Sequence, residues 1–376
     1  MFYSISKLKA LCEDHAHKTR VFDATSAEPD WVVIDNRLQN LKANYFNLGF
    51  YATSQEEVSL LFEQEEGALI FLITTQINGV ECALLQLRSE PGLIGICNLT
   101  TTIQSTPSNF LCKHGGESTP YMSIVTNPCS YGKVLYDGYQ YDWGLSYKHK
   151  TKRFLIVRVL SPPEATNGFI WVDLNTIFTL PHTNHLITND LRTMIPLLKS
   201  SCRKDVPQLV NKINISKPRY DLPLLKWNDN LMDSRGFYVV FKETLTQTRE
   251  VKKWSQPLLA SNKQIELKLY YRNTAQDVDF AVIEKSQPGL LRQNILFPAE
   301  LSQGLLKKIV HTSAEGGRFW KLKIRISLLK YSGSDQTSQA IKWISSSKLF
   351  AEANISLRTS IELRMCLSML IPGTCQ

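Results

Sequence analysis

The residues whose types best suit chemistry lie between positions 84 and 114. Residues 85–90 alternate between apolar and polar with the period of a half-buried strand, so Arg88 and Glu90 should leave it on one face. Glu90 is the lone carboxylate on that face and is the first candidate for a general acid or base. His114, whose imidazole titrates near neutrality, is the second. The structural alternatives are a Glu90 that only orients Arg88 and a His114 in a plain loop.

An uncharged polar series occupies residues 100–109. Its hydroxyl and amide groups both donate and accept hydrogen bonds. A solvated loop would more often carry Lys, Glu or Asp, so this series favours a pocket for a polyhydroxylated ligand such as a sugar. The side chains that we expect to bind hydroxyl or carbonyl groups are Gln86, Arg88, Thr102, Gln104, Ser105 and Asn109, although a structural turn bond is an alternative for each.

Three spaced elements of this stretch resemble the signature of the NDP-hexose 2,3-dehydratases. They are Gln86-x-Arg88-x-Glu90-Pro91-Gly92, Leu99-x-x-Thr102-Ile103-Gln104-Ser105-Thr106-x-Ser108-Asn109 and His114-Gly115-Gly116. Members of that family act on dTDP-4-keto-6-deoxyglucose in deoxysugar biosynthesis. Each subunit is a tandem pair of modules similar to the Nudix fold. The resemblance therefore implies an α+β fold, a tandem repeat of two Nudix-like mixed α/β modules, and a carbon–oxygen lyase.

The implied reaction follows from the chemistry of that substrate. The C4 ketone acidifies the C3 proton; its removal gives an enolate, the C2 hydroxyl leaves, and the resulting enol becomes a 3,4-diketone. This elimination needs a base, an acid and a donor to the C4 oxygen, but no redox cofactor. The sequence also lacks dinucleotide, phosphate-loop and metal-ligand motifs, so we expect no cofactor and no metal.

Cations and aromatic residues further along the chain are candidates for the nucleotide. Phosphate oxygens favour the fork of Arg and the point charge of Lys. The candidates for the diphosphate are Lys148, Arg153 and Arg192, of which Arg192 resembles a recurrent arginine of the family. The candidates for stacking on the base are Tyr121, Tyr139 and Trp143, although aromatic residues at this density more often belong to a core.

Two departures from the family pattern leave a second function open. Tyr141-Asp142-Trp143-Gly144 stands where family members have Ser-Glu-Gln-Gly, and a Trp-x-Gln-Pro element occurs only in the second module, as Trp254-Ser255-Gln256-Pro257. The alternative is a catalytically silent nucleotide-sugar-binding protein of the same fold. A Nudix hydrolase would need a carboxylate-rich helix to hold magnesium, and the sequence has no such run.

Composition sets the remaining limits. A chain of 376 residues with 43% hydrophobic and 20% charged residues is long enough for two folded domains. The formal charge of +9 favours an anionic partner, but the basic run at residues 147–153 is too short to predict nucleic-acid binding. Eight cysteines occur singly, and there is no signal-peptide or membrane-spanning run, so we expect a cytoplasmic protein without a membrane partner.

The elements that must position these residues are mostly strands. We expect a lead-in over residues 1–43 with a helix at 6–12, and a first module over 44–199 that holds the site. In this module we expect strands at 44–51, 68–75, 81–87, 133–136 and 153–160, helical segments at 171–177 and 189–198, and a hairpin at Asn78-Gly79. Proline-bearing residues 200–230 read as a linker, and 231–376 as a second module.

The second module repeats landmarks of the first. Gly92 matches Gly289 at an offset of 197, Gly144 matches Gly317 at 173, and Trp171 matches Trp343 at 172. The fall from 197 to 173 means that 24 residues of the polar loop are missing. Glu90, Thr102 and Gln104 also become Gln287, Ala299 and Leu301. We therefore expect the second module to be structural, and to form the interface of a homodimer.

Overall fold

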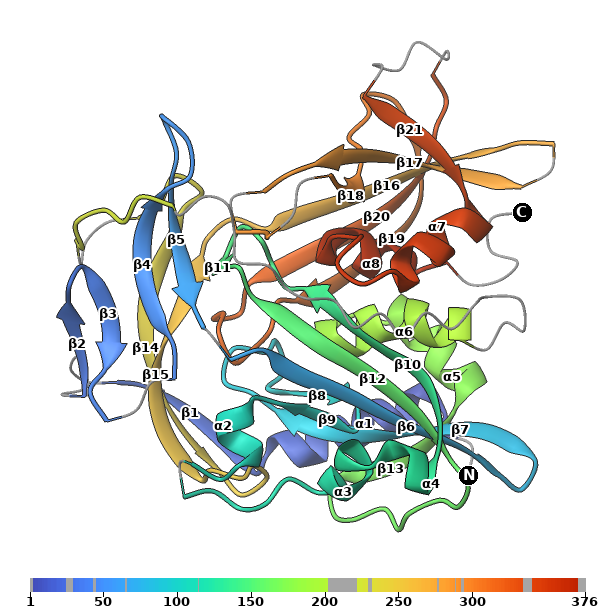
Figure 1. The fold of residues 1–376 in the computed structure, drawn as a ribbon, viewed down its shortest axis with the longest axis horizontal. Coiled ribbons are helices and arrows are strands. Elements are labelled where there is room, and N and C mark those ends of the chain that lie inside the picture. The colour runs from blue at the N-terminus through green and yellow to red at the C-terminus, as the bar shows by residue number, and fades with distance from the viewer. Residues whose placement is uncertain are drawn as a thin grey trace.

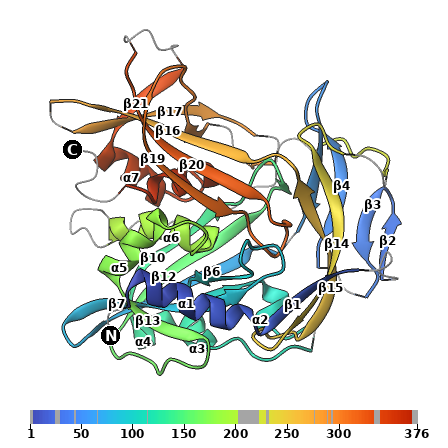
Figure 2. The same ribbon diagram turned by 180° about the vertical axis from the view of Figure 1, so that it is seen from behind.

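The computed structural model describes residues 3–24, 30–42, 45–64, 66–113, 115–201, 222–228, 232–275, 277–287, 289–291, 294–333 and 340–370. Within them the fold is mixed α and β, and most of it is sheet. Two larger sheets lie on either side of a layer of helices, and two smaller sheets stand together at one end (Figure 1, Figure 2). The α+β class predicted from the sequence is confirmed.

The first larger sheet carries the segment that the sequence singled out. Its order is β10 (Gly132–Tyr141), β12 (Thr151–Val159), β6 (Ala68–Ile77), β7 (Val80–Ser89) and β13 (Phe169–Asp173), with β8 (Cys97–Thr100) paired to β7 and β9 (Ile103–Ser105) paired to β6. β6 is apolar without alternation because both of its faces are covered. Helices α1 (Ile5–Ala16) and α6 (Asn189–Ser201) cover one face, and α3 (Met122–Thr126) covers the other.

The sequence predicted a hairpin and a helix next to this sheet, and the structure confirms the first and shifts the second. Asn78 and Gly79 have φ angles of 50° and 80°, the left-handed values that a two-residue hairpin requires, so the predicted hairpin between β6 and β7 is confirmed. The helix predicted from residue 171 was placed too early. Trp171 lies in β13, and helix α5 (Leu174–Thr179) begins only after Asp173, whose side chain accepts a hydrogen bond from the Thr176 N–H and caps it.

The second larger sheet has the same strand order. It runs β19 (Leu305–Ser313), β20 (Lys323–Lys330), β16 (Ile265–Asn273), β17 (Val278–Lys285) and β21 (Ile341–Ser345), with β18 (Ile295–Pro298) paired to β17. Helices α7 (Ser346–Asn354) and α8 (Ile361–Leu367) follow β21 as α5 and α6 follow β13. The register agrees with the offsets: Leu84 pairs with Trp171, and Ala281, 197 positions later, pairs with Trp343, 172 positions later.

Each half sends a loop onto a turn of the other half. The Gly92 N–H donates to the Gly316 carbonyl at 2.9 Å, and the Gly289 N–H donates to the Gly144 carbonyl at 3.0 Å. These reciprocal bonds match Gly144 with Gly316 and not with Gly317 as expected. The offset is therefore 197 up to the Gly92 turn and 172 from Gly144 onward, so 25 residues rather than 24 are missing from the second half. In the first half those residues form β9, α2 (Pro107–Phe110), α3 and α4 (Pro128–Tyr131).

The smaller sheets join the predicted lead-in to both halves. One has the order β1 (Thr19–Asp23), β14 (Phe237–Thr246) and β15 (Lys253–Ser261). The other has the order β11 (Tyr147–Lys148), β5 (Val58–Glu63), β4 (Asn47–Ala52), β3 (Arg37–Asn40) and β2 (Trp31–Ile34). Because β3 pairs with β4, the predicted boundary at residues 43 and 44 falls inside a sheet.

The predicted linker is only partly within the described residues. Positions 200 and 201 belong to the end of α6. Residues 202–221 and 229–231 lie outside the described part of the chain, and Leu224 forms a β-bridge with Tyr51. The division into lead-in, two modules and linker stays a prediction. In the described part of the chain, every helix is too short or too polar to span a membrane.

Candidate functional site

A cavity of about 510 Å³ lies beyond the end of β7. Its volume falls in the range of roughly 300–1,000 Å³ that is usual for small-ligand sites. The first half contributes the end of β7, the polar loop around α2, Lys150 and Asp190. The N-terminal part of the chain adds Asp30, Trp31, Asn40, Lys42, Tyr45 and Phe46, and the residues around the start of β6 add Gln64, Glu66 and Ala68. The second half contributes residues 249–251, 253–256, 315, 317 and 318.

Five of the residues predicted from the sequence line this cavity: Arg88, Glu90, Gln104, Ser105 and Asn109. The reason is local, since β7 ends at Ser89 and Pro91 turns the chain, which leaves Arg88 and Glu90 at the cavity wall. Gln104 lies in β9 opposite Ile70 of β6, and its Oε1 accepts a hydrogen bond from the Thr100 hydroxyl at 2.8 Å. The polar loop therefore forms part of a pocket, as expected for an uncharged series.

Glu90 is buried among cations. The side chain is 2% exposed, and its Oε1 accepts from Arg88 Nε at 2.8 Å and lies 3.7 Å from Arg249 Nη1. Its Oε2 has no hydrogen-bond partner among the described residues. Glu250 completes the group: burial opposes its ionisation, but Arg249 and Arg88 outweigh that effect and lower the pKa of Glu250 to about 2. Among the described residues, Glu90 thus has one carboxylate oxygen without a hydrogen-bond partner. It lies in a group of two carboxylates and two guanidinium groups whose charges balance.

A second buried ion group forms another part of the wall. Lys152 Nζ lies 2.8 Å from Asp190 Oδ1, 3.0 Å from Asp142 Oδ2 and 3.2 Å from Glu315 Oε2. Lys150 Nζ lies 3.2 Å from Asp142 Oδ2 and 3.9 Å from the centre of the Tyr147 ring. Lys150, Asp190 and Glu315 line the cavity, whereas Lys152 does not and pairs with both of these carboxylates.

Burial changes the proton affinity of two groups in this wall. Burial raises the pKa of Asp190 to about 6; Lys152 opposes the rise, and Glu315 and Asp142 add to it. Burial also lowers the pKa of Lys150, although Glu315 and Asp142 favour its charged form. The oxygen Oδ2 of Asp190 has no hydrogen-bond partner within the described ranges. Sequence reasoning missed both residues: Asp190 was not singled out as a site residue, and Lys150 was counted only as part of the basic run at residues 147–153.

The rest of the lining is rich in aromatic side chains. Trp31 and Phe46 pack with ring centres 5.1 Å apart, and the guanidinium of Arg318 lies 4.1 Å from the centre of the Phe46 ring. Tyr45 and Trp254 also line the cavity. Flat apolar faces of this kind are suited to stacking against a nucleobase. Of these aromatic residues, the sequence analysis singled out only Trp254, in the Trp-x-Gln-Pro element. Gln256 of the same element also lines the cavity.

Several predicted site residues lie elsewhere. The Thr102 hydroxyl donates to the Leu84 carbonyl at 2.6 Å and accepts from the Ile73 N–H, so Thr102 ties the sheet together. Gln86 is in β7 opposite Thr100 but does not line the cavity. His114 lies outside the described residues.

The three predicted diphosphate ligands also have other partners. Lys148 pairs with Glu63, Arg153 forms a fork on Asp137, and Arg192 is buried and donates to the Pro181 carbonyl. None of the three lines the cavity. Of the predicted stacking residues, Tyr121 packs on Phe169, Tyr139 packs in a cluster with Tyr141, and Trp143 belongs to the core of the second half.

The prediction that residues 231–376 are only structural needs correction. Arg249, Glu250, Trp254, Glu315 and Arg318 come from that region and line the cavity. They reach it because strand β14 turns back at residues 247–252 and because the loop at residue 316 docks on the Gly92 turn. The site is therefore built by both halves.

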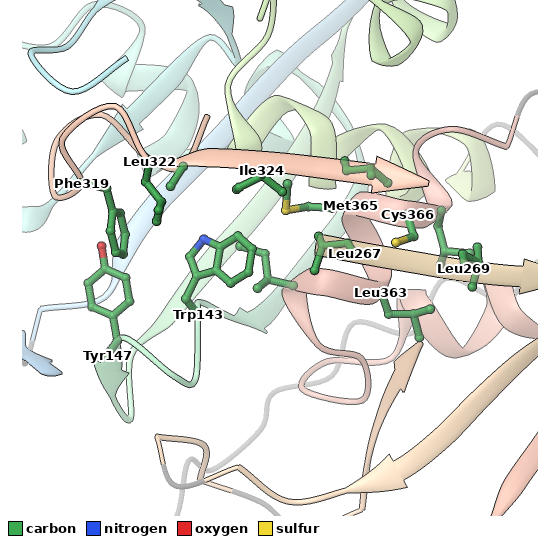
Figure 3. Close-up of a cluster of buried hydrophobic side chains, with 14 of the residues drawn as sticks. Trp143, Tyr147, Leu267, Leu269, Phe319, Leu322, Ile324, Leu363, Met365 and Cys366 are labelled. Atoms are coloured by element: carbon green, nitrogen blue, oxygen red, sulfur yellow. The ribbon is translucent and has the colours of Figure 1, made fainter. Parts of the chain in front are cut away.

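The corresponding positions of the second half form a hydrophobic core instead of a charged wall. At the offset of 172, Asp142, Lys150 and Lys152 correspond to Ala314, Leu322 and Ile324. Those three side chains are at most 2% exposed and belong to one apolar cluster. Figure 3 shows Trp143 from the first half packed beside Leu322 and Ile324 in this cluster. At these three positions the first half therefore has charged side chains and the second half has apolar ones.

Comparison with known proteins identifies the family. A family model described as NDP-hexose 2,3-dehydratase matches residues 8–198, slightly more than half of the chain. A Streptomyces violaceoruber protein named dTDP-4-dehydro-6-deoxy-alpha-D-glucopyranose 2,3-dehydratase is 24% identical over 82% of this chain and 81% of its own length. A protein of the same name from Saccharopolyspora spinosa is 22% identical over 70% of this chain.

Coverage of the relatives is uneven. The alignment spans 57% of the Saccharopolyspora spinosa protein, and 46% of a protein with the same name from Amycolatopsis orientalis that is 26% identical to this chain. The matched residues 8–198 include β7, the polar loop and the N-terminus of α6, which carry Glu90, Gln104 and Asp190. The chain therefore belongs to the NDP-hexose 2,3-dehydratase family.

Proposed function

We propose that this protein removes water across C2 and C3 of a nucleotide-diphospho-4-keto-6-deoxyhexose to give a 3,4-diketo-2,6-dideoxy sugar nucleotide. The names of the relatives point to dTDP-4-keto-6-deoxyglucose as the substrate. One observation carries the proposal. A buried carboxylate with an unpaired oxygen, a buried ammonium group and an uncharged polar wall meet in one cavity, at Glu90, Lys150 and Gln104.

The first half of the reaction assigns roles to two side chains. Glu90 takes the C3 proton through its unpaired oxygen, while Arg88 and Arg249 hold the other oxygen and fix the side chain. Electrons of the C3–H bond then form the C3–C4 double bond, and negative charge develops on the C4 oxygen. The Lys150 ammonium group, buried at the cavity wall, donates a hydrogen bond to that oxygen. Burial of Lys150 away from water strengthens this interaction.

The remaining lining would orient the substrate. Gln104, Ser105 and Asn109 offer neutral donors and acceptors for the sugar hydroxyls. Trp31, Phe46 and Trp254 offer aromatic surface for the base, and Arg318 lies beside that surface as a cation for the diphosphate. Gln86, Thr102, Lys148, Arg153 and Arg192 are not kept as ligands, because each lies away from the cavity.

The proposal also includes the Nudix-like tandem repeat, the homodimer and the cytoplasmic location. The shared strand order and register of the two larger sheets support a tandem repeat of Nudix-like modules. We infer a homodimer and a cytoplasmic location. The six cysteines within the described residues are free thiols, which suits a reducing compartment.

Trapping the product tests this function. The purified protein is incubated with dTDP-4-keto-6-deoxyglucose without nicotinamide, and o-phenylenediamine is added, because this diamine condenses with adjacent ketones to a stable quinoxaline. We expect a quinoxaline that carries a 2-deoxy sugar. Glu90→Gln serves as the inactive control. Tight binding of the substrate without any quinoxaline would favour the alternative function, a catalytically silent nucleotide-sugar-binding protein.

A further inference from the structure

We propose that Asp190 is the general acid that protonates the C2 hydroxyl as it leaves. This inference rests on the proposed dehydration and completes it, since an elimination needs an acid as well as a base. Asp190 is the second residue of α6, which begins at Asn189 and packs against the first larger sheet. It faces the cavity that also contains Glu90.

The geometry gives Asp190 and Glu90 matching arrangements. Each is 2% exposed, and each has one oxygen held by a cation of its own half, Lys152 for Asp190 and Arg88 for Glu90. Each has a second oxygen without a hydrogen-bond partner in the described part of the chain. A buried carboxyl oxygen without a partner is costly unless a ligand completes it. Two such oxygens in one cavity are what an acid and a base acting on neighbouring carbons require.

The surrounding charges distinguish the two roles. Glu90 faces two guanidinium groups, those of Arg88 and Arg249, which suits a residue that works as a carboxylate. Asp190 shares one cation, Lys152, with two further carboxylates, Glu315 and Asp142. Two acidic neighbours and burial favour the protonated form of Asp190. Tyr147 and Arg364 also interact electrostatically with it.

The elimination balances with these two residues, and solvent supplies the proton exchange of the tautomerisation that follows. The proton of the Asp190 carboxyl passes to the C2 oxygen while the C2–O electron pair departs with that oxygen as water. The enolate electrons form the C2–C3 double bond and restore the C4 carbonyl. The C3 hydroxyl of the resulting enol then loses a proton, and C2 gains one from solvent. The proton that Glu90 took from C3 replaces the one that Asp190 gave.

Glu315 belongs to the second half, so the proton affinity of the acid is set partly across the interface between halves. Glu315 and Asp190 lie within hydrogen-bonding distance of the same ammonium group, and the negative charge of Glu315 raises the pKa of Asp190. Glu315→Gln removes that charge but keeps an oxygen that can accept from Lys152. It should therefore lower the pKa of Asp190 and make the acid lose its proton at a lower pH.

The first test compares the turnover rate of Asp190→Asn with that of the wild type, which is measured first. We expect a loss of at least on the order of a hundredfold, typical of losing general acid catalysis, with dTDP affinity unchanged in calorimetry. Glu362→Gln is the matched control, because Glu362 lies 172 positions later, is 8% exposed and does not line the cavity. A wild type without turnover refutes the proposed function itself. Equal turnover rates for the wild type and Asp190→Asn would refute only the role of Asp190.

The second test is the pH profile of single-turnover rates. A general acid makes the rate fall as pH rises, so the alkaline limb belongs to Asp190. Glu315→Gln should move that limb to lower pH by on the order of one unit, the size produced by a charge within about 6 Å, and Glu315→Asp should restore it. A merely structural role would lower the rate without moving the limb. An unmoved limb, a limb moved to higher pH, or a shift confined to the acidic limb would overturn the assignment.

Discussion

Lys152→Met should destabilise the fold far more than the loss of one ion pair at the surface. Lys152 is 3% exposed, and its ammonium group is within 3.2 Å of Asp142, Asp190 and Glu315. Removing it leaves two buried carboxylates, Asp142 and Asp190, and the partly buried carboxylate of Glu315 to share Lys150 and Arg318. Breaking a buried pair by removing one partner costs about 3–5 kcal/mol. That is a large part of the roughly 5–15 kcal/mol by which most proteins are stable.

Arg153→Met is the matched control. Arg153 is the next residue in β12 and forms a pair of similar length, 2.7 Å, with Asp137, but its side chain is 36% exposed. An exposed pair of this kind contributes about 0–1 kcal/mol. Urea unfolding followed by tryptophan fluorescence compares the two variants with the wild type, and the slope against urea checks that the same surface is exposed in each.

The effect of Lys152→Met should also depend on pH. In the wild type, burial opposes ionisation of Glu315, but Lys152, Lys150 and Arg318 outweigh it and lower its pKa. A lowered folded pKa contributes stability above the unfolded value near 4.5, and that stability is lost as pH falls. Asp190 has a raised pKa, about 6, so its ionisation costs stability that builds up as pH rises from the unfolded value near 3.8 and is complete above about 6. Without Lys152, ionised Glu315 contributes less stability and ionisation of Asp190 costs more. The variant should therefore be least stable at pH 8 and recover toward pH 5.

Equal losses for Lys152→Met and Arg153→Met would refute this reasoning, because burial would then not decide the cost. A loss for Lys152→Met that stays constant between pH 5 and 8 would also contradict it, since the three carboxylates would then not be the source.

Three further predictions concern the cavity. Glu90→Gln should lower turnover at least on the order of a hundredfold with little change in substrate affinity, because the amide cannot accept the C3 proton; a folded variant with near-full activity would move the role elsewhere. Gln104→Ala should impair turnover with the free energy of unfolding nearly intact, whereas Leu301→Asp should lower that free energy by about 1–3 kcal/mol or dissociate the oligomer, because Leu301 packs in an apolar cluster. Unchanged kinetics for Gln104→Ala would contradict the first part. Activity should survive exhaustive treatment with EDTA, and a loss restored by zinc or magnesium would show that the elimination depends on a metal.

Local patterns were sufficient to predict one wall of the site. The alternation of residues 85–90 predicted that Arg88 and Glu90 share one face, and both line the cavity at the end of β7, as do Gln104, Ser105 and Asn109 of the uncharged series. The same reasoning assigned Thr102 to the ligand, although its hydroxyl bonds to the Leu84 carbonyl. A polar side chain next to a site bonds to backbone as readily as to a ligand, and sequence does not distinguish the two.

The opposite wall depends on contacts between distant parts of the chain. Arg249 and Glu315 reach the cavity because the halves exchange loops, and no local period encodes that exchange. The repeat itself was visible, but without the reciprocal bonds at Gly92 and Gly289 it suggested two separate modules. The basic run at 147–153 does not form one solvated face: Lys150, just before β12, and Lys152, within it, are both buried, while Arg153 is 36% exposed.

The most direct test of the central claim is proton NMR of dTDP-4-keto-6-deoxyglucose incubated with the protein in D2O. Dehydration with tautomerisation places one hydrogen from solvent on C2. The account predicts that the C2 hydroxyl is lost and that C2 carries a single deuterium, with Glu90→Gln and Asp190→Asn giving no such product. A substrate that binds yet keeps its C2 hydroxyl would contradict it.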